Sequence, residues 1–314
     1  MLGASNTLHV MISCLLCGVW AVKPVFSIEI KAIKELLRIS FPFAILGFFY
    51  YVDTKIELLL LYKIKGTVDA GYYSSAMRLI DMLVMVVISI AAPLFPRLSY
   101  IMSKETRENA VKVVSLSVKY MAVLSAPFVL IVSMLSSDYT SLVLGKEFMK
   151  SSPVLGILIW GIFIFSLRII PGHALYAGRH TTLVAYVFGA NIIINMGLNL
   201  LFIPKYSYLA TSVIHLTCGA LSLAGVTYLA SRKIGNPKTH LYLRKVMAAM
   251  AVQAVFIYSL QDRMNFITLS LLSLFLYSAV VLFIRYFDAR DISILRNLLK
   301  KKTLRPDFGH EFSP

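Results

Sequence analysis

The chain has 314 residues, of which 58% are hydrophobic and only 15% are charged, whereas an ordinary soluble domain is roughly 25% charged. This composition excludes a disordered, collagen-like or nucleic-acid-binding protein. The formal charge of +16 does not by itself indicate a polyanion partner, because basic residues also collect in the cytoplasmic loops of membrane proteins.

Nine segments of the sequence are candidates for crossing a bilayer, which takes about 20 apolar residues at a rise of 1.5 Å per residue. The first and the eighth are shorter than the others. The sequence therefore predicts an all-α, polytopic integral membrane protein with about nine transmembrane helices. The segments are approximately residues 8–22, 40–62, 68–96, 113–137, 153–171, 182–203, 208–230, 246–260 and 265–286.

Basic residues alternate in abundance between the loops that separate these segments. One set of loops, together with the C-terminal tail, contains 21 Lys and Arg residues, and the other set contains 6. Since Lys and Arg accumulate on the cytoplasmic side, this alternation predicts a cytoplasmic C-terminus. Lys23 follows the first apolar segment and no basic residue precedes it, so this segment is predicted to be a membrane helix rather than a signal peptide.

Two segments outside the predicted spans are amphipathic, one between the first and second spans and one in the C-terminal tail. Phe26, Ile30, Ile33 and Leu37 repeat at helical spacing beside basic residues, which is typical of a helix on the cytoplasmic surface. The C-terminal tail repeats this pattern, so both segments are predicted to be anchors beside anionic lipid, with partner binding as the alternative. The predicted parts are a transmembrane helix at 1–24, an amphipathic cytoplasmic linker helix at 25–39, a six-helix lobe at 40–231, two additional transmembrane helices at 232–287 and a basic cytoplasmic tail at 288–314.

Motifs of soluble enzymes are absent from the sequence. There is no Gly-rich phosphate loop, no His-Glu-x-x-His pair and no dinucleotide fingerprint. Cys14 and Cys17 have the spacing of a metal or redox pair but lie in an apolar segment without a second pair, so they are interpreted as buried cysteines. The protein is therefore predicted to be neither an enzyme nor a metal or cofactor protein. His215 lies within a predicted span, where either hydrogen-bonded packing or proton handling accounts for it.

Ionisable side chains within the predicted spans are the main candidates for function, because they are costly in lipid and usually face a cavity or another helix. Asp53 and Glu57 share one helix face at i,i+4, whereas Lys55 points about 200° away from Asp53. Packing or snorkelling is the alternative for both acids. Arg168 lies near the predicted cytoplasmic end of its span and is expected to snorkel to the surface.

Two further polar groups fall within the spans. Arg78 and Asp81 are spaced i,i+3 near the middle of one span, which allows either a structural ion pair or a cavity site. Asn191, Asn195 and Asn199 follow at strict i,i+4 spacing, which places three amides on one helix face. These amides are suited to sugar hydroxyls and equally to neighbouring helices.

The order of several motifs is that of a known family. These are Gly66, Ala70-Gly71-Tyr72-Tyr73-Ser74, Ala76, Arg78, Pro93 and Pro96, then Leu144-Gly145-Lys146-Glu147-Phe148, and then Asn195, Asn199 and Ile203-Pro204-Lys205-Tyr206. Over about residues 50–230 the chain resembles the polysaccharide-biosynthesis flippases, which are O-antigen-type lipid-linked oligosaccharide translocases of the multidrug/oligosaccharidyl-lipid/polysaccharide superfamily. Family members usually have two lobes. This chain resembles the last helix of the first lobe, the cytoplasmic linker, the second lobe and two further helices.

The resemblance implies that the chain moves a lipid-linked oligosaccharide across the cytoplasmic membrane for surface polysaccharide biosynthesis, by rocking of two lobes. The implied partners are a polyprenyl-pyrophosphate-linked oligosaccharide and membrane lipids. A missing N-terminal lobe, a second copy of the chain or polysaccharide assembly proteins are further candidates. No nucleic-acid partner is implied. The alternatives are a cation-coupled multidrug-type exporter and a non-transporting subunit or truncated fragment.

Residue roles follow from the same resemblance. Arg78 is the candidate for binding phosphate, because a guanidinium pairs well with phosphate oxygens. No cofactor is implied, apart from possible coupling to Na+ or H+. The candidates for the substrate cavity are Arg78, Asp81, Asn191, Asn195 and Asn199, and those for ion coupling are Asp53 and Glu57.

Overall fold

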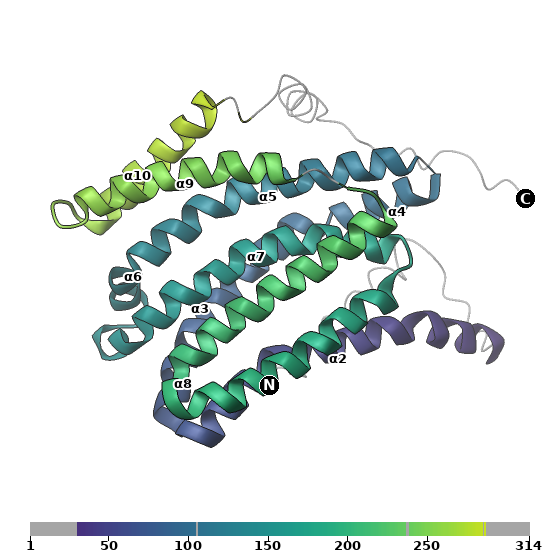
Figure 1. The fold of residues 1–314 in the computed structure, drawn as a ribbon, viewed down its shortest axis with the longest axis horizontal. Coiled ribbons are helices and arrows are strands. Elements are labelled where there is room, and N and C mark those ends of the chain that lie inside the picture. Colours follow the sequence, from purple (N-terminus) through teal and green to yellow (C-terminus); the bar gives the residue numbers. More distant parts are fainter. Residues whose placement is uncertain (1–29, 105, 237–238, 285, 287–314) are drawn as a thin grey trace, which may run out of the picture. The chain divides into compact units, whose positions relative to one another are not determined.

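The computed structural model describes residues 30–104, 106–236, 239–284 and 286. Every regular element in these ranges is helical (Figure 1), which confirms the predicted all-α fold. In chain order the elements are α2 (Ile30–Lys65), α3 (Thr67–Ala91), α4 (Leu94–Lys104), α5 (Arg107–Met134), α6 (Ser136–Val143), the short 3-10 helix η1 (Lys146–Ser151), α7 (Ser152–Ala177), α8 (Thr181–Lys233), α9 (His240–Leu260) and α10 (Phe266–Phe283).

The chain divides into two compact units, Met1–Ala44 and Ile45–Pro314. The described part of the first unit is the beginning of α2. The sequence predicts a separate linker helix at residues 25–39, but α2 continues without a break from Ile30 to Lys65. A change of hydropathy does not by itself end a helix, because the backbone hydrogen bonds are the same in both environments. The site described below lies within the second unit.

Within the described residues, six helical segments are long and apolar enough to cross a membrane. They cover all the predicted spans from residue 68 onward, because the bent helix α8 accounts for both 182–203 and 208–230. Helix α2 contains the predicted span 40–62 but carries several charged residues and is not one of the six. The predicted span 8–22, with Cys14 and Cys17, lies outside the described residues. The basic tail at 288–314 also lies outside them.

Helix α8 reverses its direction near its middle (Figure 1). At the turn, Ser207 has φ of 51° and ψ of −136°, and Pro204 has no N–H to continue the helical hydrogen bonds. The Ser207 hydroxyl donates to the Asp69 carboxylate, and Lys65 Nζ donates to the Pro204 carbonyl over 2.7 Å. These bonds hold the turn of α8 against the junction of α2 and α3, where Gly66 adopts a left-handed φ of 86° that favours glycine.

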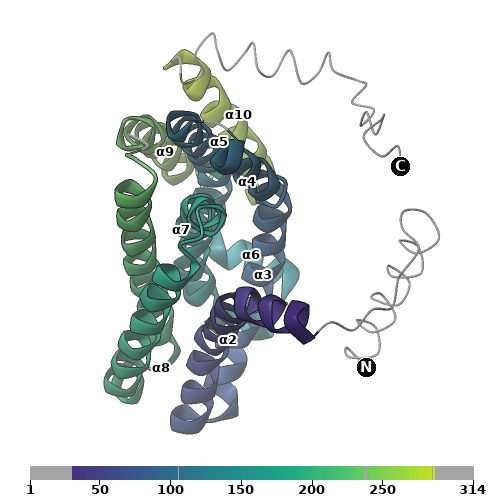
Figure 2. The ribbon, with the colours of Figure 1, turned by 90° about the vertical axis from the view of Figure 1, so that its right-hand side faces the viewer.

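Helix α7 lies in the middle of the second unit, where it packs against α3, α5 and α8 (Figure 2). Leu155, Leu158, Ile159 and Ile170 are each no more than 1% exposed. Burial on more than one face requires a helix that is apolar nearly all round. A charged residue in such a helix therefore needs partners within the protein.

The last two helices pack against α5. Pro127 within α5 has no N–H, so the carbonyl of Val123 lacks its usual helical donor. The Tyr277 hydroxyl of α10 donates to this carbonyl over 3.2 Å. Lys119, which also lies on α5, is 1% exposed, and its Nζ lies 4.9 Å from the ring centroid of Tyr242 in α9. Both contacts attach the pair α9 and α10 to the rest of the second unit.

Candidate functional site

The carboxylate of Glu57 joins three parts of the second unit. Glu57 lies on α2 and is only 1% exposed. Tyr73 on α3 donates its hydroxyl to Oε2 over 2.6 Å, and Asn195 on the first arm of α8 donates Nδ2 to Oε1 over 2.5 Å. Nδ1 of His215, on the second arm of α8, lies 3.0 Å from Oε2. We call these four residues the Glu57 cluster; its buried acid is satisfied by protein partners, as a buried charge requires.

The three asparagines of α8 share a buried face, as their spacing predicts. Asn191, Asn195 and Asn199 are 5%, 1% and 0% exposed. Asn199 donates Nδ2 to the side-chain Oδ1 of Asn195 over 2.7 Å and to its backbone oxygen over 2.9 Å. Asn199 therefore packs behind Asn195, and only the other two asparagines line the neighbouring cavity.

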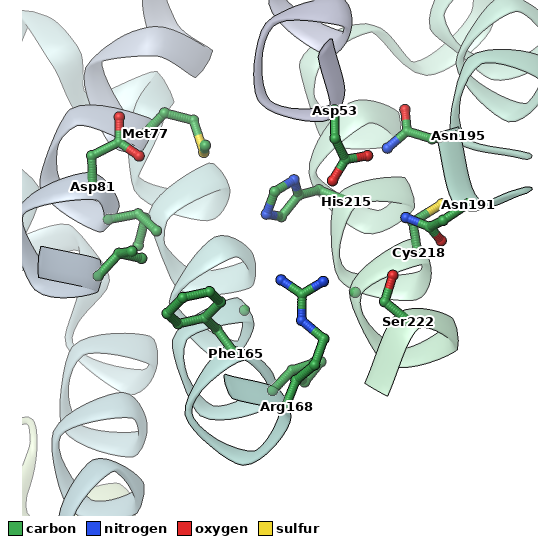
Figure 3. A pocket seen from close by; sticks show the side chains of 15 residues that line it. Asp53, Met77, Asp81, Phe165, Arg168, Asn191, Asn195, His215, Cys218 and Ser222 are labelled. Atoms are coloured by element: carbon green, nitrogen blue, oxygen red, sulfur yellow. The ribbon is translucent and has the colours of Figure 1, made fainter. Parts of the chain in front are cut away.

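This cavity, which we call the polar pocket, lies beside the Glu57 cluster. Figure 3 shows acidic, basic and amide side chains from separate helices converging on it. Acidic and basic groups both contribute, so the pocket has no single sign of charge. The lining residues are Asp53 of α2, Met77, Ile80, Asp81 and Val84 of α3, Gly161, Ile164, Phe165 and Arg168 of α7, and Asn191, Asn195, His215, Cys218, Gly219 and Ser222 of α8.

Three lining residues of the polar pocket have buried polar atoms without a hydrogen-bond partner among the described residues. These atoms are Oδ1 of Asp53, Oδ1 of Asn191 and Oγ of Ser222. Buried polar groups in proteins are usually paired, and leaving one unpaired costs about 1–3 kcal/mol. The three oxygens are therefore the groups of this pocket best placed to contact a ligand.

Arg168 does not follow the prediction that it snorkels to the membrane surface. Its guanidinium points into the polar pocket (Figure 3). The guanidinium carbon lies 4.8 Å from the ring centroid of Phe188 and 5.5 Å from that of Phe165. Stacking on aromatic rings suits the planar, weakly hydrated guanidinium. Phe188 belongs to α8 and comes close to Arg168 only when the chain is folded. Its ring stabilises the positive charge of Arg168 in the protein interior.

Arg78 and Asp81 are separated by the fold. Both side chains are exposed, but Asp81 lines the polar pocket and Arg78 does not. The predicted ion pair between them is not formed in the described structure, although their i,i+3 spacing permits one. Lys55 is also exposed and outside the pocket, in agreement with its predicted direction. A charge on the exposed surface of a membrane helix needs a water-filled space or another protein segment in front of it.

Sequence reasoning missed two partners of Glu57. The sequence leaves both packing and proton handling open for His215, and it presents Tyr73 only as part of a motif. Their contacts to Glu57 join residues 158 and 16 positions apart. The single available signal was that a buried acid needs donors, which does not say which residues supply them.

Comparison with known proteins agrees with this architecture. Residues 4–153 match the family described as "Polysaccharide biosynthesis protein". Over 166 residues, which are 53% of this chain, the sequence is 26% identical to the "Probable low-salt glycan biosynthesis flippase Agl15" of Haloferax volcanii. That alignment covers 34% of Agl15, so the chain spans well under half the length of this relative.

A solved structure shares the fold. The structure of the lipid II flippase MurJ in an inward closed conformation superposes with a TM-score of 0.69 at 14% sequence identity. The match covers 89% of this chain and 58% of MurJ. Together with the six apolar helices among the described residues, this similarity gives the chain a multi-pass, all-helical membrane fold like that of MurJ.

Proposed function

Since this chain is a relative of the polysaccharide biosynthesis flippases, we propose that it takes part in moving a lipid-linked oligosaccharide from the cytoplasmic to the outer leaflet of the membrane. The observation that carries this proposal is the polar pocket, which gathers charged and amide groups of four helices in a chain of flippase-like fold. Buried polar groups of this kind within a membrane protein are usually functional.

The chemistry of the substrate supports this assignment. A polyprenyl pyrophosphate carries negative charge, and its oligosaccharide carries many hydroxyls, so it does not cross lipid without polar contacts. Guanidinium groups bind phosphate oxygens, and amides and carboxylates bind hydroxyls. We assign Arg78 to the pyrophosphate and Asp81, Asn191 and Asn195 to polar contacts along the path, with Asn199 positioning Asn195.

Ion coupling is assigned to Asp53 rather than to Glu57. Glu57 already accepts hydrogen bonds from Tyr73 and Asn195 and lies against His215, which leaves little of its capacity for a cation. Asp53 faces the polar pocket with an unpartnered oxygen. A carboxylate of this kind binds Na+ or H+, and Glu57 then maintains the helix arrangement around it.

The proposal includes a second lobe and an orientation. Rocking transport needs two opposed lobes, and this chain matches 58% of MurJ. We infer that another segment, a second copy or a partner protein supplies the opposing lobe.

The alternation of basic residues supports a cytoplasmic C-terminus. Cysteines placed beside Arg244 and in the tail should then resist an impermeant thiol reagent added to intact cells, and labelling of the tail would overturn this orientation.

Export in a cell that lacks its own flippase tests the function. We expect surface polysaccharide to return when this chain is expressed together with a complementary N-terminal lobe, and not when this chain is expressed alone. The Asp53→Asn variant should fail in the same assay at an equal protein level. Glu108→Gln, which removes an exposed carboxylate paired with Lys112, is the matched control. Equal export by the wild type and Asp53→Asn would refute the assignment of the polar pocket to transport.

A further inference from the structure

A second cavity, which we call the aromatic pocket, adjoins the polar pocket. Both cavities have Phe165 and Arg168 in their lining, so the Arg168 side chain lies at the boundary between them. The aromatic pocket is further lined by Phe188 of α8 and by His173 and Tyr176 in the last part of α7. Its chemistry is therefore one cation, one imidazole and several aromatic rings.

The two cavities differ in their acids. Asp53 and Asp81 line the polar pocket, whereas none of the described residues that line the aromatic pocket carries a carboxylate. Asp53, which interacts electrostatically with Arg168, lies on the polar-pocket side of the guanidinium. On the side of the aromatic pocket the guanidinium faces lining residues without a carboxylate among the described residues, which favours an anionic ligand there. The aromatic pocket is therefore suited to a negatively charged group.

Arg168 is held in a position from which it can bind such a group. Phe188 and Phe165 lie 4.8 Å and 5.5 Å from its guanidinium carbon. Stacking uses the flat face of the guanidinium, and the group has five N–H donors along its edge. It can therefore hold an anion in addition to its present contacts, and the fork of two donors matches two phosphate oxygens.

His173 supplies a second polar atom. Its Nδ1 is buried and has no hydrogen-bond partner within the described part of the chain. The ring is held by Phe95 at 5.7 Å and by Tyr176 at 6.3 Å between ring centroids. An unpaired buried nitrogen is unusual in a folded protein, and an anion that accepts a hydrogen bond from Nδ1–H would satisfy it.

The backbone beside these residues leaves room for a ligand. Pro171 and Gly172 follow Arg168 by one turn of α7, and Gly172 lines the aromatic pocket. A methyl group built on Gly172 would meet no atom outside α7 within 4 Å. Helix α7 then leads to Arg179, which the basic-residue pattern places on the cytoplasmic side.

We propose that Arg168 and His173 form a binding site for the diphosphate group of a polyprenyl lipid, close to the cytoplasmic side of the second unit. This inference rests on the proposed function, and it adds a site distinct from Arg78. The aromatic walls contact the first isoprene units, and Arg168 transfers the anion from the aromatic pocket toward the polar pocket that it also borders.

The test is equilibrium binding of radiolabelled farnesyl diphosphate to the full chain in phosphatidylcholine nanodiscs. We expect Arg168→Gln to weaken binding at least tenfold and His173→Phe to weaken it about threefold. The affinity of Arg168→Lys should lie between those of wild type and Arg168→Gln, because the charge remains and the fork of two donors is lost. Arg232→Gln removes an exposed arginine that lies outside both cavities and should bind like wild type. Thermal unfolding of each variant shows whether it is folded, and Arg168→Lys provides the comparison if Arg168→Gln is not.

Competition separates the two sources of a phosphate group. Unlabelled farnesyl diphosphate should displace the probe, whereas farnesol and nanodiscs containing phosphatidylglycerol should not. Displacement by phosphatidylglycerol at comparable concentration would assign the site to a glycerophospholipid headgroup and overturn the proposal. Equal affinity of wild type and of folded Arg168 variants would also overturn it.

Failure of this inference is distinguishable from failure of the proposed function. Transport that depends on Asp53, combined with binding that does not depend on Arg168, would remove the aromatic pocket as a site and leave the flippase assignment intact. Arg168-dependent binding without any transport in the complemented cell would support the site and remove the flippase assignment.

Discussion

Asp53 and Glu57 lie one turn apart on α2 and have opposite surroundings. Glu57 is buried in its cluster with partners from α3 and from both arms of α8. Asp53 faces the polar pocket with a buried oxygen that lacks a partner among the described residues. A carboxylate satisfied by the protein holds helices together, whereas one left unsatisfied is available to a ligand. The pair therefore separates an acid that is satisfied by the protein from an acid that is available to a ligand on one helix face, and we propose a structural role for the first and a functional role for the second.

The largest effect should come from removing the structural acid. Glu57→Ala leaves Tyr73, Asn195 and His215 without their acceptor, and each unpaired buried group costs about 1–3 kcal/mol. We expect the free energy of unfolding to fall by several kcal/mol and the thermal midpoint in detergent to fall with it. Asp53→Ala should change the midpoint far less. Equal losses in the two variants would contradict the distinction between the two acids.

Removing the functional acid should change transport instead of stability. Asp53→Asn keeps the shape of the side chain and removes its charge, so it should leave the thermal midpoint near that of wild type. Transport should fall at least tenfold and should lose its dependence on an imposed Na+ or H+ gradient, which is measured in proteoliposomes. Gradient-dependent transport at the wild-type rate would show that Asp53 does not couple an ion.

The asparagines of α8 extend the same comparison with a smaller effect. Asn195 bonds to Glu57 and accepts from Asn199, whereas Oδ1 of Asn191 has no partner among the described residues. We expect Asn195→Leu to lower the free energy of unfolding by about 1–3 kcal/mol and Asn191→Leu to lower it less, while transport falls in both. A greater loss of stability for Asn191→Leu would mean that this amide has a structural role.

The smallest effect on stability is expected for Arg78. Its side chain is exposed and forms no ion pair with Asp81 in the described structure, so Arg78→Met should leave the protein level unchanged. Export should fall, and Arg78→Lys should retain part of it, because a lysine keeps the charge but not the bidentate fork. Normal export by the double variant Arg78→Met, Asp81→Leu would exclude a role for both residues in binding substrate.

The sequence predicted much of the fold but less of the site. The spans after residue 68 agree with the observed helices, and the shared faces of Asp53 with Glu57 and of Asn191 with Asn195 follow from helical spacing. The continuity of α2 through residue 39 and the inward direction of Arg168 were not predicted. Both depend on neighbours: a helix ends where its backbone bonds end, and Arg168 points toward Phe188, which belongs to another helix.

Hydropathy and periodicity by themselves determined that the chain is helical, because a segment in lipid must satisfy its backbone hydrogen bonds internally. The same patterns identified the polar residues within the spans as candidates for function. Only the tertiary structure decided which candidates are satisfied by the protein and which face a cavity. The donors of Glu57 come from residues 138 positions away at Asn195 and 16 positions away at Tyr73. Because such contacts depend on how helices pack and not on local spacing, the sequence does not contain a local signal for them.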